Sequence, residues 1–63
     1  MVAIYQNVKA ACKEKGISVN NLEQELGFAR GSIYKWDTNT PGVDKVKAVA
    51  DYFNKTVEYF LRE

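Results

Sequence analysis

Apolar residues recur at spacings of three and four in five short segments, and residues that start or end helices separate these segments. In the first segment Ile4, Val8 and Cys12 share one helical face, while polar side chains occupy the other face. Gly16 follows directly, at the position where a helix end favours a residue that tolerates a positive φ. Stripes of this kind are buried when helices pack against each other, so the pattern predicts an all-α fold.

The predicted elements are five helices with short connections. Their expected bounds are Val2–Lys15, Val19–Leu26, Arg30–Trp36, Val43–Phe53 and Val57–Leu61. Ser18 and Thr56 precede the second and the last of them and are suitable N-caps. Residues 37–42 consist of loop-forming types, and no alternating run is long enough for a strand.

Length and composition limit the classes of function. With 63 residues the chain holds one domain, residues 1–63, and a modest core. There is no histidine, and Cys12 is the single cysteine, so we expect no enzyme, no metal site and no cofactor. We also expect no signal peptide, no membrane span, no small-molecule ligand and a reducing, cytoplasmic location. A net charge of +1 argues against a coat protein that binds nucleic acid through charge alone.

Residues 18–36 contain the most informative spacing. Two short predicted helices are joined by about three residues that begin with Gly27, which permits a tight reversal. Ile33 and Trp36 lie three residues apart and face inward, which leaves a polar, positive side without an acidic residue. This arrangement predicts a helix-turn-helix, whose second helix enters the DNA major groove.

The stretch ISVNNLEQELGFARGSIYKW (17–36) resembles the XRE family of regulators, the Cro-type helix-turn-helix proteins related to lambda repressor. The later stretches AVADYFN (48–54) and VEYFL (57–61) resemble the fourth and fifth helices of that family. The resemblance implies a compact five-helix, lambda-repressor-like domain with the helix-turn-helix at its second and third helices. It also implies binding to operator double-stranded DNA as a homodimer.

The resemblance and the position of each residue suggest three groups of site residues. Candidates for contact with DNA bases are Arg30, Gly31, Ser32, Tyr34 and Lys35. Candidates for contact with DNA phosphates are Ser18, Asn20, Thr38, Asn39 and Lys45. The apolar cluster at the end of the chain should complete the core with one or two members and offer the rest to a dimer, and its members are Tyr59, Phe60 and Leu61.

Three positions depart from the family pattern. Many members have a small residue where this chain has Glu23, so we expect this carboxylate to point outward. Ala29 stands where the family usually has a capping hydroxyl residue, and losing such a cap costs about 1 kcal/mol. The loop 38–40 is neutral, which weakens the phosphate contacts expected there.

Together these features predict a sequence-specific DNA-binding domain of a bacterial or phage transcriptional regulator, a repressor acting by occlusion. It would be the whole regulator or the N-terminal part of a longer one. A different class stays open, namely a protein-interaction module on the same scaffold, such as an antirepressor or a toxin-neutralising partner. The near-zero net charge and the apolar end favour that alternative. An RNA-binding module would need exposed aromatic platforms, which the predicted inward spacing does not supply.

Overall fold

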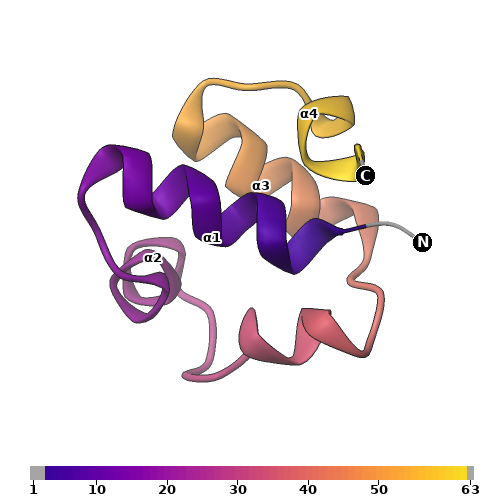
Figure 1. The fold of residues 1–63 in the computed structure, drawn as a ribbon. Coiled ribbons are helices and arrows are strands. Elements are labelled where there is room, and N and C mark those ends of the chain that lie inside the picture. Colours follow the sequence, from indigo (N-terminus) through magenta and orange to yellow (C-terminus); the bar gives the residue numbers. More distant parts are fainter. Residues whose placement is uncertain (1–2, 63) are drawn as a thin grey trace.

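The computed structural model describes residues 3–62 (Figure 1). Within that range four α-helices and one short 3-10 helix follow one another, and no residue lies in a strand. The elements are α1 (Ile4–Lys15), α2 (Val19–Leu26), η1 (Tyr34–Asp37), α3 (Val43–Phe53) and α4 (Val57–Leu61). The predicted all-helical fold is therefore confirmed. None of these helices is long and apolar enough to cross a membrane.

Local chemistry explains where the helices begin and end. Gly16 and Gly27 follow α1 and α2 with φ of 78° and 73°, a left-handed conformation that glycine adopts without a steric penalty. The hydroxyl oxygens of Ser18 and Thr56 accept a backbone N–H three residues further on, at 3.0 and 3.2 Å. Both predicted N-caps are thus confirmed, and they mark the starts of α2 and α4.

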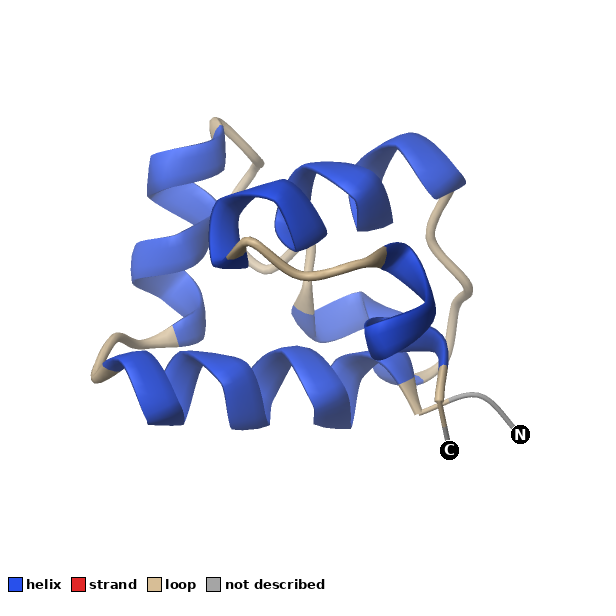
Figure 2. Ribbon diagram, turned by 90° about the horizontal axis from the view of Figure 1, so that it is seen from above, coloured by secondary structure: helices blue, strands red, loops and turns tan. Residues whose placement is uncertain are grey.

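The core is formed by buried side chains of all four α-helices and by Ile33, which lies between α2 and η1 in the sequence. Its largest fully buried side chains are Phe60, Leu22, Ile33, Val8 and Val49. Cys12 is also buried, as its place on the inward stripe predicted, and desolvation raises the pKa of its thiol. Seen from above, the helices surround this single centre and are joined by short loops (Figure 2).

The last helix returns to the start of the first. The Asn7 side-chain amide donates to the carbonyl oxygen of Phe60 at 3.0 Å and to that of Arg62 at 2.6 Å. These bonds satisfy carbonyls at the end of α4 that have no partner within that helix. The first and last helices therefore lie beside each other, although they are far apart in sequence (Figure 1).

Two of the five predicted helices have other bounds in the structure. Val2, the predicted start of the first helix, lies outside the described residues, and α1 begins at Ile4. The predicted helix Arg30–Trp36 is wrong in type and length, because residues 30–33 form turns and only Tyr34–Asp37 is helical, with 3-10 geometry. The other three predicted ranges match α2, α3 and α4.

Candidate nucleic-acid interface

Residues 30–37, called here the capped segment, begin with a backbone conformation that excludes a regular α-helix. Gly31 has φ of 86°, in the left-handed region, so right-handed helical geometry cannot extend through it. The Ser32 N–H donates to the Ala29 carbonyl at 3.0 Å, and the Trp36 N–H donates to the Ile33 carbonyl at 2.9 Å. Each of these bonds spans three residues, which is the tighter 3-10 pattern. The conformation of Gly31 thus explains why the predicted α-helix does not begin at Arg30, and bonds that span three residues give Tyr34–Asp37 its 3-10 geometry.

Glu23 on α2 holds the capped segment in place from inside the protein. Its Oε1 accepts the Gly31 N–H and its Oε2 accepts the Ile33 N–H, each at 2.9 Å. The side chain is only 3% exposed. The expectation that this carboxylate points outward is therefore wrong. Because Ala29 offers no capping oxygen, the unpaired N–H groups at the start of the segment take their acceptor from α2.

A sequence signal for this role was present. Glu23 lies four residues after Val19 and directly after Leu22, within the apolar stripe that α2 turns toward the core. An acidic residue on such a stripe needs hydrogen-bond donors nearby, since an unpaired buried charge is costly. The donors here lie eight and ten residues further along the chain, so only the fold identifies them.

The predicted base-contacting residues lie around a buried anchor. Ile33 is fully buried, whereas Arg30, Tyr34 and Lys35 are exposed, Tyr34 to 68%. Gly31 and Ser32 are half-buried, and the predicted inward residue Trp36 is also half-buried, with its ring 6.1 Å from that of Phe28. The segment therefore presents two cations and a tyrosine at the surface while Ile33 attaches it to the core.

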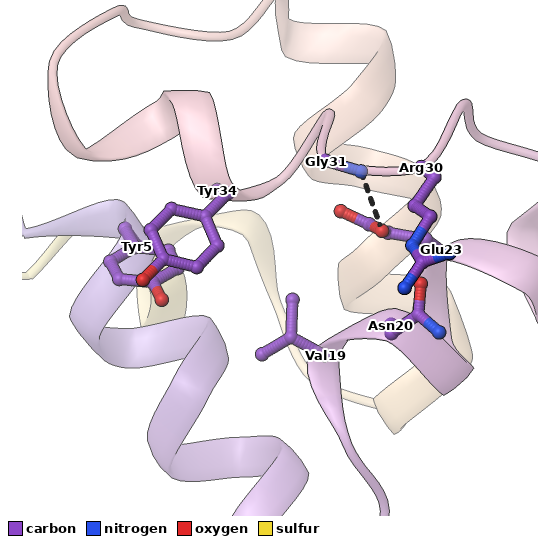
Figure 3. Close-up of a pocket in the computed structure, with 7 residues that line it drawn as sticks. All are labelled: Tyr5, Val19, Asn20, Glu23, Arg30, Gly31 and Tyr34. Atoms are coloured by element: carbon purple, nitrogen blue, oxygen red, sulfur yellow. Dashed lines mark hydrogen bonds between the residues drawn. The ribbon is translucent and has the colours of Figure 1, made fainter.

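A shallow pocket of about 260 Å³ opens beside the capped segment (Figure 3). Its lining comes from α1, α2 and the capped segment, and the residues are Tyr5, Val19, Asn20, Glu23, Arg30, Gly31 and Tyr34. The rings of Tyr5 and Tyr34 lie 5.4 Å apart, centroid to centroid, at 32°. Desolvation raises the pKa of Tyr5, and the neighbouring Tyr34 adds to this shift, so the Tyr5 hydroxyl is protonated at neutral pH. Tyr5 was not predicted to belong to any site, because its partner is 29 positions away in sequence.

The predicted phosphate-contacting residues are all exposed, but they have different surroundings. Asn20 lines the pocket together with Arg30. The hydroxyl oxygen of Ser18 is engaged in capping α2, and the Thr38 hydroxyl donates to the Lys35 carbonyl at 3.4 Å. The Lys45 ammonium lies over the Phe28 ring, 4.7 Å from its centroid, which holds the start of α3 near the turn after α2. Asn39 is exposed in the loop before α3, and its side chain has no hydrogen-bond partner within residues 3–62.

The apolar end of the chain divides into a core residue and surface residues. Phe60 is 0% exposed, so its side chain belongs to the core of one chain and cannot contact a second copy. This corrects its place among the predicted dimer residues. Leu61 is 40% exposed, and Tyr59 is half-buried between two cations, with Lys55 Nζ at 4.7 Å and Arg62 Cζ at 3.8 Å from its centroid. Only Tyr59 and Leu61 keep surface that a partner could cover.

Charges around the capped segment are mixed rather than uniformly positive. Arg30 and Lys35 lie within it, whereas Asp37 closes it and Asp44 follows in the first turn of α3. Arg30 and Lys35 therefore make a short positive surface that two acidic residues follow along the chain. In comparisons with known proteins, no family model, no curated protein and no solved structure matches this chain.

Proposed function

We propose that this chain binds double-stranded DNA and recognises base sequence with the capped segment, as a helix-turn-helix transcriptional regulator does. The observation that supports this most is the position of Glu23, whose buried carboxylate holds the backbone of Gly31 and Ile33. A rigidly held segment with exposed Arg30 and Lys35 suits recognition of base edges, which requires fixed donor positions. In this proposal α2 is the first helix of the helix-turn-helix, and the capped segment takes the place of its recognition helix.

The proposed contacts follow from the chemistry of each exposed side chain. Arg30 can pair its guanidinium with the O6 and N7 of one guanine, the commonest specific contact in the major groove. Lys35, on the next turn of the capped segment, contacts a neighbouring base or phosphate. Asn20 and Lys45 contact the backbone on either side, which sets the register of the protein on the duplex. The carboxylate of Glu23 accepts two backbone N–H groups, which offset part of its negative charge toward the DNA.

We also propose that the chain has the five-helix, lambda-repressor-like arrangement, with η1 as its shortened third helix. A regulator of this kind acts as a homodimer that places two recognition elements about 34 Å apart along the duplex. Binding then occludes the promoter. This dimer would use Leu61 and Tyr59, which are the members of the terminal apolar cluster with exposed surface.

A second candidate function is a protein-interaction module. It is favoured by the exposure of Val43 and Leu61, two aliphatic side chains on α3 and α4 that this chain does not bury. Exposed apolar groups of this kind mark contact surfaces when they are contiguous. The DNA-binding proposal has the stronger support, because it accounts for two exposed cations on a segment that a buried carboxylate holds.

Selection of bound sequences from a pool of random duplex DNA, at two salt concentrations, tests the proposal. We expect an enriched palindromic motif and an affinity that falls steeply as salt rises, because bound cations release counterions from the phosphates. Salt-sensitive binding without a motif would show that the chain docks on DNA without recognising sequence. Absence of binding at low salt would exclude the proposal and favour the protein-interaction module.

Replacing Arg30 by alanine should relax sequence preference at one base pair of the selected motif. The expected loss of affinity is on the order of 1–3 kcal/mol, the range for one bidentate base contact. The matched control is Lys47→Ala, because it removes one positive charge from an exposed position of α3 that is not among the proposed contacts. Competition binding with each single-base variant of the motif measures the effect. An unchanged preference at every position would remove Arg30 from the proposed base contacts.

A further inference from the structure

The pocket beside the capped segment has polar groups at its two ends and an apolar middle. Figure 3 shows Tyr5 and Tyr34 on one side, Asn20 and Arg30 on the other, and Val19 between them. The two tyrosine hydroxyls can donate hydrogen bonds, and the amide and guanidinium groups at the opposite end can donate as well. A molecule that fits this arrangement has hydrogen-bond acceptors at both ends and apolar surface between them.

The remaining polar group of the pocket does not compete for such a molecule. Each oxygen of Glu23 already accepts one backbone N–H group, and these two donors offset part of the carboxylate's charge toward a molecule in the pocket. The pocket is also open to solvent, and its 260 Å³ lies below the range of about 300–1,000 Å³ found for small-molecule sites. These properties favour a polymer that passes across the pocket rather than a small molecule that the pocket encloses.

We infer that the pocket seats one deoxyribose of the DNA backbone together with the phosphates on both sides of it. The sugar lies against Val19 and the tyrosine rings, Tyr5 and Tyr34 donate to one phosphate, and Asn20 donates to the next. Phosphate oxygens only accept hydrogen bonds, and the sugar between them presents C–H surface, which matches the order of groups in the pocket. The inference rests on the proposed function, and it adds α1 to the DNA-binding surface through Tyr5.

The experiment measures affinity for a fluorescently labelled duplex of mixed sequence at low salt, where binding depends on backbone contacts. We expect Tyr5→Phe and Asn20→Ala each to weaken binding by about two- to tenfold, the effect of one lost hydrogen bond. The slope of affinity against salt should stay unchanged for both variants, because neither removes a charge. The controls are Tyr52→Phe and Asn21→Ala, which make the same changes at residues that do not line the pocket.

Each outcome distinguishes the inference from the proposal on which it rests. Thermal unfolding of all four variants first establishes that they are folded, as expected for a lost hydroxyl and for exposed amides. If the unmodified chain binds the duplex and Tyr5→Phe and Asn20→Ala bind equally well, the inference is wrong and DNA binding stands. If the controls weaken binding as much as the pocket variants, the inference is again wrong. If the unmodified chain does not bind at all, both fail.

Discussion

Replacing Glu23 by alanine should lower the free energy of unfolding by about 2–6 kcal/mol, since one buried and one part-buried N–H donor lose their acceptor at roughly 1–3 kcal/mol each. These donors are the Gly31 and Ile33 backbone N–H groups. A chain of this length has a total stability of about 3–9 kcal/mol at 0.05–0.15 kcal/mol per residue. The variant should therefore be partly unfolded, and the remaining folded fraction should bind DNA weakly because the capped segment is no longer held. Urea unfolding and duplex titration measure the two effects.

Two companion variants make this result specific. Glu23→Gln should fall between alanine and the natural residue, since its amide still offers one acceptor oxygen to the segment. Glu25→Ala removes the same charge from an exposed position of the same helix and should change stability by about 0.5 kcal/mol or less. Equal stability of Glu23→Ala and Glu25→Ala would contradict the role of Glu23 in holding the capped segment.

Replacing Phe60 by alanine should cost about 3–5 kcal/mol, the range for removing a buried aromatic side chain from a core. The side chain is fully buried and packs near Phe53 and Tyr59, with ring centroids 6.0 and 5.0 Å away. Leu61→Ala, at the next and exposed position, is the matched control and should cost much less at protein concentrations too low for the proposed dimer to form. Urea unfolding at several protein concentrations measures both.

The dependence on concentration separates a core residue from an interface residue. A loss of stability that is the same at all protein concentrations places Phe60 in the core of a single chain. A loss that shrinks or grows with concentration would instead place it between two copies, because association stabilises by mass action. In that case the burial of Phe60 within one chain would be wrong.

Much of this fold could be predicted from the sequence because it depends on neighbours in the chain. Helix periodicity and the capping residues Ser18, Thr56 and Gly27 involve contacts three or four positions apart, so α2, α3 and α4 have the bounds that were predicted. The exposure of Arg30 and Lys35 followed in the same way from the inward position of Ile33. Their contact with DNA remains a prediction.

The features that were missed depend on contacts between distant positions. Gly31 adopts a positive φ, and Glu23 turns inward, because the backbone of the capped segment lies against α2 in the folded protein. Tyr5 joins the pocket only when α1 brings it to Tyr34. The sequence by itself determined the helices through local hydrogen bonding. Only the tertiary structure decided which backbone donors the Glu23 carboxylate satisfies, since an acceptor and its donors become neighbours when the chain is packed.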